Sequence, residues 1–198
     1  MIAFKLLTPG RLRLMSSAAM LLLATVCATE ARSEGEADKE PTETTFIVVR
    51  HAEREGNQDK LSAQGEARAE TIRSLGTALR VSAIYSTNTE RTKNTVKPLG
   101  EALKLKTQLY GRITRNWPTE LEQANSGGVV LIVGHSNTTG VIAGLLADKP
   151  AFPIGHDEYD AMFIVTRRGS ESNCVRLKFG VASGDNDLET SIRPGRAR

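Results

Sequence analysis

The fold is best predicted from one short stretch, Phe46-Ile47-Val48-Val49-Arg50-His51-Ala52-Glu53. Its first four residues are β-branched or aromatic, and a continuous apolar run of this kind is typical of a strand buried on both faces of a sheet. The run ends abruptly on Arg50 and His51. Because ligands bind at the carboxyl ends of strands in open α/β sheets, we expect any chemistry to begin at these two residues. A solvated Arg-His pair at a strand end is the alternative.

A second apolar run, at 129–133, ends on Gly134-His135-Ser136. The chain holds three histidines, and two of them, His51 and His135, follow its two most apolar runs. Adjacent strands lie about 4.8 Å apart, so neighbouring parallel strands would bring both imidazoles into one pocket. Metal binding is the competing use of histidine. No His-x-x-x-His or Cys/His spacing occurs and no carboxylate lies beside His135, so we expect no metal and no cofactor.

Strands and helices alternate along the rest of the chain. Apolar periodicity and capping residues predict helices at 62–80, 90–103 and 138–147, a short helix from Trp117, strands at 81–86 and 107–110, and a closing pair of strands at 161–166 and 174–181. This alternation predicts an α/β fold, a three-layer α/β/α sandwich with a mostly parallel central sheet.

The composition is that of a globular protein rather than a disordered one. Of 198 residues, 39% are hydrophobic and 25% are charged, and the formal net charge is +3. Four basic residues and one acidic residue lie in the first 33, which leaves 22 of each sign in the remainder. The remainder is therefore neutral, and we expect no nucleic acid partner.

The N-terminus has the pattern of a secretory signal peptide. Three basic residues precede the run 14–27, which is apolar apart from two serines and a threonine, and Val26 and Ala28 suit the −3 and −1 positions of a cleavage site. The run is short for a membrane span, although a retained anchor is the alternative. We therefore predict a signal peptide at 1–33, no stable membrane span after cleavage, and a periplasmic or secreted protein.

The mature chain is expected to have three parts. The polar, acidic segment 34–45 is typical of a linker, the predicted domain occupies 46–182, and the polar segment 183–198 is predicted to be a disordered tail. After cleavage only Cys174 remains, so the domain cannot form an internal disulfide and must rely on its core.

Two histidines with arginines nearby suit a phosphoryl group. Arginine matches phosphate oxygens in a bidentate manner and keeps its charge. A neutral imidazole can attack phosphorus and form a phosphohistidine, and the transfer then depends on positioning and on stabilisation of charge at the oxygens.

Four segments resemble the motifs of a known family. Arg50-His51-Ala52-Glu53 resembles the arginine-histidine signature of the histidine phosphatase superfamily, also called phosphoglycerate mutase-like. Three further segments are similar, in the family's order and spacing: the helix start at 61–69, the segment 85–95 with Arg91, and the second-histidine segment 133–137. In addition, Asn57 lies six residues after His51, where the family has an asparagine. The similarity extends over about residues 45–182.

The resemblance implies a role for each matching residue. His51 would be the phosphorylated nucleophile, and Arg50, Arg91 and His135 would surround the phosphate and stabilise its charge. Asn57 would be a further donor on the phosphate side. A solvated helix residue is the alternative for Arg91.

One departure from the family pattern concerns the general acid. Many members carry an acidic residue after the short third strand, but residues 109–114 of this chain contain no carboxylate. Glu53 is the nearest catalytic alternative, and Asp157 and Glu158 are others. The remaining possibility is a substrate with an easier leaving group, since proton donation matters most for poor ones.

These observations lead to one preferred function and two alternatives. We expect a metal-independent phosphatase of the histidine acid phosphatase type that hydrolyses a phosphomonoester through a phosphohistidine on His51. The substrate would be a phosphorylated small molecule or an envelope sugar phosphate. Few insertions are available to form a lid, which favours hydrolysis over mutase chemistry. The alternatives are a protein phosphohistidine phosphatase and a non-catalytic phosphate-binding module.

Overall fold

The computed structural model describes residues 42–183. The predicted signal peptide (1–33), most of the linker (34–45) and all but the first residue of the predicted tail (183–198) lie outside the described residues, so this segmentation stays a prediction. In chain order the elements are β1 (Thr44–Arg50), α1 (Ala63–Ala78), β2 (Ala83–Ser86), α2 (Glu90–Leu103), β3 (Thr107–Leu109), α3 (Trp117–Ala124), β4 (Val129–Gly134), α4 (Thr139–Leu146), β5 (Ala161–Arg168) and β6 (Glu171–Lys178).

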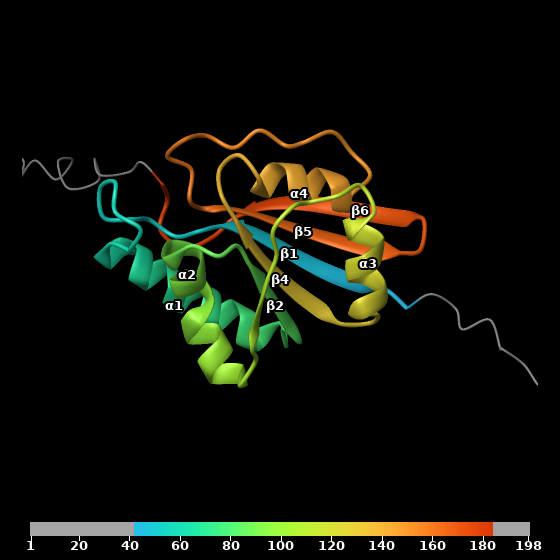
Figure 1. Ribbon diagram of the computed structural model, residues 1–198, viewed down its shortest axis with the longest axis horizontal. Helices are drawn as coiled ribbons and strands as arrows, with labels where there is room; N and C mark the ends of the chain where they lie inside the picture. Colours follow the sequence, from blue (N-terminus) through green and yellow to red (C-terminus); the bar gives the residue numbers. More distant parts are fainter. Residues whose placement is uncertain (1–41, 184–198) are drawn as a thin grey trace, which may run out of the picture. The chain divides into compact units, whose positions relative to one another are not determined.

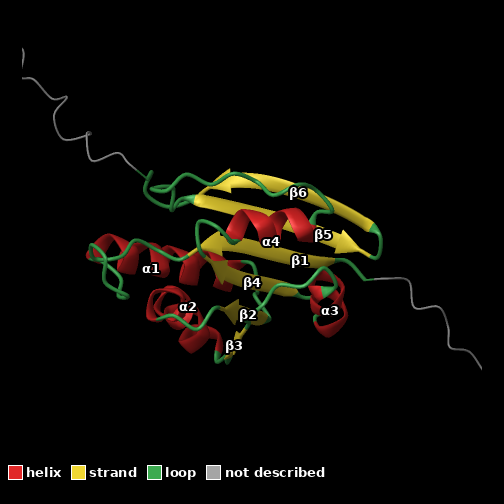
Figure 2. Cartoon of the chain, turned by 45° about the horizontal axis from the view of Figure 1, so that its top comes forward, coloured by secondary structure: helices red, strands yellow, loops and turns green. Residues whose placement is uncertain are grey.

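The strands form one sheet in the order β3-β2-β4-β1-β5-β6, which Figure 2 shows running from β6 at the top to β3 at the bottom. The pairs β2–β3, β2–β4 and β1–β4 are parallel, and β5 pairs antiparallel with both β1 and β6. The sheet is therefore mostly parallel, as predicted. Since β1 and β4 are neighbours, with Arg50 opposite Gly134, the residues that follow them emerge side by side.

Helices α1 and α2 cover one face of the sheet and helices α3 and α4 cover the other (Figure 1), and a hydrophobic core lies on each face. On one face Phe46 and Val48 of β1 pack in a cluster with residues of α3 and α4. On the other face Ile47 and Val49 pack in a cluster with residues of α1 and α2. Full burial of each such side chain stabilises the fold by about 1.5–3 kcal/mol, which explains why a continuous apolar run lies at the centre. The predicted three-layer sandwich is confirmed.

The helix boundaries follow from local chemistry. The Ser62 side chain accepts a hydrogen bond from the Gly65 amide and caps α1, as expected. Helix α2 begins after Thr89, whose side chain caps it, and continues past Pro98 to the predicted end. β1 begins two residues earlier than predicted and β6 three residues earlier. Among residues 42–183, no helix is long and apolar enough to cross a membrane.

Candidate active site

The carboxyl ends of β1 and β4 bring two histidine rings together. The ring centroids of His51 and His135 lie 5.4 Å apart, with an angle of 69° between the ring planes. The Tyr159 ring, just before β5, lies 5.8 Å from the ring of His51. His51 is buried and His135 is half-buried. The expectation that neighbouring parallel strands bring the two imidazoles together is confirmed.

The chemical state of His51 suits a nucleophile. Its Nδ1 lies 2.8 Å from the Ala52 carbonyl, which can only accept, so Nδ1 carries the proton and Nε2 keeps its lone pair. The pKa of His51 is lowered to about 4. Burial is the main cause, the hydrogen bond to Ala52 opposes it, and the charge of Arg50 adds to it. Burial, together with the charge of Arg91, also lowers the pKa of His135. Both rings are therefore neutral at neutral pH.

Helices α1 and α2 hold the loop that carries His51. The amide of Ala52 donates to Oγ1 of Thr95 at 2.9 Å, and the amide of Ser62 donates to the Glu53 carbonyl at 3.0 Å. A Cβ atom at Gly65 would lie only 2.0 Å from that same carbonyl oxygen. Glycine is therefore required at the first turn of α1, because the nucleophile loop passes directly against the helix backbone.

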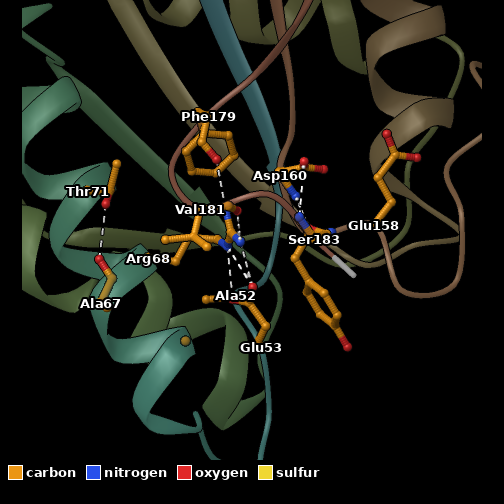
Figure 3. Close-up of polar contacts among 12 residues, drawn as sticks. Ala52, Glu53, Ala67, Arg68, Thr71, Glu158, Asp160, Phe179, Val181 and Ser183 are labelled. Carbon is orange, nitrogen blue, oxygen red and sulfur yellow. Dashed lines mark hydrogen bonds and ion pairs between the residues drawn. The ribbon is translucent and has the colours of Figure 1, made fainter. Parts of the chain in front are cut away.

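Glu53 fastens this loop through a buried ion pair. Nε of Arg68 donates to both carboxylate oxygens of Glu53, at 3.0 and 2.9 Å, and Nη2 donates to one of them at 2.6 Å. The same guanidinium donates to the carbonyls of Phe179 and Val181, each at 2.8 Å. Figure 3 shows Arg68 between the carboxylate and these carbonyls. Arg68 thus joins the nucleophile loop, α1 and the segment after β6.

This arrangement bears on the catalytic role predicted for Glu53. Both carboxylate oxygens of Glu53 are occupied as acceptors of hydrogen bonds from the buried Arg68 guanidinium. The geometry therefore favours a structural role for Glu53, and proton donation by this residue stays a prediction without support from its contacts.

Arg50 is held by the loop that precedes β5. Its Nη1 donates to the backbone carbonyls of Gly155, His156 and Glu158 at 3.3, 2.5 and 3.3 Å. The guanidinium carbon lies 3.9 Å from the centroid of the Tyr159 ring, a cation–π contact. The side chain is thereby fixed at the end of β1 beside His51.

Arg91 reaches the same pocket from the first turn of α2. Its Nη1 donates to Oδ1 of Asp59 at 2.7 Å, and its charge lowers the pKa of both His51 and His135. The side chain is 22% exposed, so Arg91 is not the fully solvated helix residue considered as the alternative.

Three buried polar atoms of this pocket have no hydrogen-bond partner among residues 42–183: Nε of Arg50, Nε of Arg91 and Nε2 of His135. Buried polar groups are normally paired, so such atoms call for an explanation. All three can act as donors, and two belong to cations. A small anion such as phosphate is the kind of ligand that accepts from groups of this type.

The other residues predicted for the site are exposed or are paired with residues outside it. Asn57 is exposed in the loop after β1, and its role as a donor stays a prediction. The Asp157 side chain is 84% exposed and contacts His156. Glu158 accepts from the amide of Gly155 and from Arg176, and these contacts lower its pKa. No group of three or more histidine, cysteine or acidic side chains that could hold a metal occurs within residues 42–183.

Two important residues were not identified from the sequence. Arg68 could have been suspected, because it lies four residues before the buried Ile72 and therefore on the core face of its helix. No local pattern indicates the role of Asp59, since the first residue it contacts, Glu90, lies 31 residues later in the chain.

The fold and the site define a class: an α/β protein in which two histidine rings meet at the carboxyl ends of two parallel strands, with two arginines near them. The family model of the histidine phosphatase superfamily (branch 1) matches residues 46–114, which include Arg50, His51 and Arg91. This match and the shared fold support the resemblance to the histidine phosphatase superfamily that the sequence motifs indicate. They support a phosphatase, a hydrolase of phosphoryl groups.

Solved structures share the fold at low sequence identity. A mycobacterial glucosyl-3-phosphoglycerate phosphatase is 14% identical, with a TM-score of 0.56 over 69% of this chain and 98% of that chain. The phosphoserine phosphatase of Entamoeba histolytica, solved with 3-phosphoglyceric acid, is 13% identical, with a TM-score of 0.52 over the same shares of the two chains. No curated protein sequence matches this chain.

Proposed function

We propose that this protein hydrolyses phosphomonoesters through a phosphohistidine on His51, without a metal. The observation that carries the proposal is that Arg50, Arg91 and His135 each keep a buried nitrogen without a partner among residues 42–183, while the His51 imidazole beside them is neutral. Nε2 of His51 would attack phosphorus, and the bond from phosphorus to the leaving oxygen would break. Water would then attack the phosphohistidine, releasing inorganic phosphate and regenerating His51.

The surrounding donors would stabilise the charge that develops during transfer. The two guanidinium groups would bind the equatorial oxygens of the phosphoryl group, and His135 would donate to a further oxygen from Nε2. These groups are held before the substrate arrives, Arg50 by the loop before β5 and Arg91 by Asp59. Little rearrangement would therefore be needed in the transition state.

The state of the nearby carboxylates narrows the substrate class. Glu53 is paired with Arg68, Glu158 has a lowered pKa, and Asp157 is exposed. None is suited to donate a proton to a poor leaving group at neutral pH. We therefore favour substrates whose leaving oxygen is acidic, such as aryl or acyl phosphates, over simple alkyl phosphates.

The same observation favours one second candidate, a protein phosphohistidine phosphatase. A phosphoramidate bond to imidazole breaks more readily than an alkyl phosphate ester and has less need of a strong general acid. The predicted signal peptide disfavours this candidate, because an exported protein would not meet the phosphorelay proteins, which operate in the cytosol. If the prediction of export holds, the substrate would be a phosphorylated small molecule or sugar phosphate of the cell envelope.

The test is phosphate release by the purified full chain from p-nitrophenyl phosphate in EDTA, with His51→Ala as control. Alkaline quenching of a single turnover with labelled phosphoramidate would trap label on His51. We expect release by the wild type, label on the wild type and neither on the variant. Activity that survives in His51→Ala would overturn the mechanism, and binding of phosphate without label or release would identify a non-catalytic binding module.

A further inference from the structure

Asp59 makes three hydrogen bonds at the start of α2, although it lies 31 residues earlier in the chain. Oδ2 accepts from the amide of Glu90 at 3.0 Å, and Oδ1 accepts from the amide of Arg91 at 3.2 Å and from its Nη1 at 2.7 Å. The side chain of Asp59 is 45% exposed. One carboxylate thus binds both the backbone of the first helical turn and the side chain of a site residue.

These contacts occupy one corner of the Arg91 guanidinium, at Nη1. Nη1 is occupied by Asp59, whereas Nε is buried and has no partner among residues 42–183. Nε and Nη2 form the side-on edge of a guanidinium, which binds two phosphate oxygens in parallel. An arginine on a helix surface would otherwise sample many rotamers, and the ion pair with Asp59 restricts it to those in which Nη1 lies beside the carboxylate.

The electrostatics exclude a second role for Asp59, that of the missing general acid. Burial acts to raise its pKa, but the two backbone amides and the Arg91 guanidinium outweigh that effect, so the pKa of Asp59 is lowered. Asp59 is therefore ionised at neutral pH and has no proton to donate. Its negative charge also acts on His135, whose pKa it raises against the effects of burial and Arg91.

Resting on the proposed function, we infer that Asp59 is a positioning residue that holds the Arg91 guanidinium in register with the bound phosphoryl group. It does not touch the reacting atoms, and it acts through Arg91. Loss of Asp59 should therefore weaken phosphate binding and transition-state stabilisation while the fold remains intact.

The chain offers a matched control for the capping function of Asp59. Oγ1 of Thr89 accepts from the amide of Thr92 and caps the same helix without contacting Arg91. Thr89→Ala therefore removes a cap and leaves the guanidinium contact in place. Asp59→Asn removes the ion pair and keeps one acceptor oxygen in place of two, so it retains part of the capping function and loses the negative charge beside Arg91.

The experiment measures the dissociation constant of inorganic phosphate by calorimetry, kcat and KM for p-nitrophenyl phosphate, and the thermal midpoint of each full-length variant. We expect Asp59→Ala and Asp59→Asn to weaken phosphate binding on the order of tenfold, the equivalent of one charge-assisted hydrogen bond. Thr89→Ala should lower the thermal midpoint and leave phosphate affinity unchanged. In an Arg91→Ala background, Asp59→Ala should have no further effect on kcat/KM.

Two results would overturn the inference: phosphate affinity within about twofold of wild type in both Asp59 variants, or an equal effect of Asp59→Ala with and without Arg91. Phosphate binding is measured independently of turnover. A wild-type protein that binds phosphate without hydrolysing the ester would refute the proposed function while the affinity comparison still tests Asp59.

Discussion

The two sides of the active site are built differently, as the anchors of their arginines show. Arg50 is 4% exposed, follows a core strand, and is held by backbone carbonyls and the Tyr159 ring. Arg91 lies on a helix surface with 22% of its side chain exposed and is held by one carboxylate, Asp59. The buried side also contains the Glu53–Arg68 pair, at 11% and 2% side-chain exposure.

This difference separates stability from recognition. Contacts on the buried side belong to the core, so disrupting them should unfold the protein. Contacts on the exposed side are hydrated and screened, so disrupting them should reduce function and leave stability almost unchanged.

Arg68→Ala should cause the largest loss of stability. It leaves the Glu53 carboxylate buried without its partner, and removing one member of a buried pair costs about 3–5 kcal/mol. Urea denaturation measures this free energy of unfolding. Arg73→Ala is the control, because Arg73 pairs with Glu70 on the exposed face of the same helix and its loss should cost under about 1 kcal/mol. Equal costs for the two variants would contradict the assignment of Arg68 to the core.

Arg50→Ala and Arg91→Ala should reduce kcat/KM by similar factors, on the order of 10²–10³, since each removes a donor to the transition state. Their thermal midpoints should differ. Arg50→Ala also frees the carbonyls of Gly155 and Glu158 and should lower the midpoint by several degrees, whereas Arg91→Ala should change it little. A larger thermal shift for Arg91→Ala would reverse the proposed division between the two sides.

The depressed pKa of His51 should make stability depend on pH. The folded state holds this imidazole at a pKa of about 4, whereas the unfolded chain has a value of about 6.5. Between these values the unfolded state binds more protons, so stability should fall as pH decreases from about 6.5 to about 4, by about 3 kcal/mol. Urea denaturation across this range should give a flatter profile for His51→Gln than for the wild type. Identical profiles would show that His51 is not buried in its neutral form.

Salt should affect the two ion pairs unequally, and this is the smallest effect expected. The exposed Asp59–Arg91 pair should contribute about 0.2–1 kcal/mol to stability, and 1 M NaCl should abolish that contribution. The contribution of the buried Glu53–Arg68 pair should persist. Double-mutant cycles at low and high salt measure the coupling energy of each ion pair. Equal salt sensitivity of the two pairs would contradict the distinction between a buried and an exposed side.

The elements could be predicted from the sequence because their causes are local. The apolar run of β1, the Ser62 cap and the limits of α2 each depend on residues within a few positions of one another. The meeting of His51 and His135 could also be inferred, since two apolar runs of an α/β chain are expected to become neighbouring parallel strands. The predicted proton donor was chosen by nearness to His51 in the chain, and the structure turns Glu53 toward α1 instead.

The layers, the strand ends and the residue types that could bind a phosphoryl group thus follow from local sequence patterns. How those residues are held depends on tertiary packing, because each anchor comes from a distant segment: Arg68 for Glu53, Asp59 for Arg91, and the loop before β5 for Arg50. Such pairings depend on how whole helices and loops pack against the sheet. Periodicity and capping, which act over a few residues, contain no information about that packing.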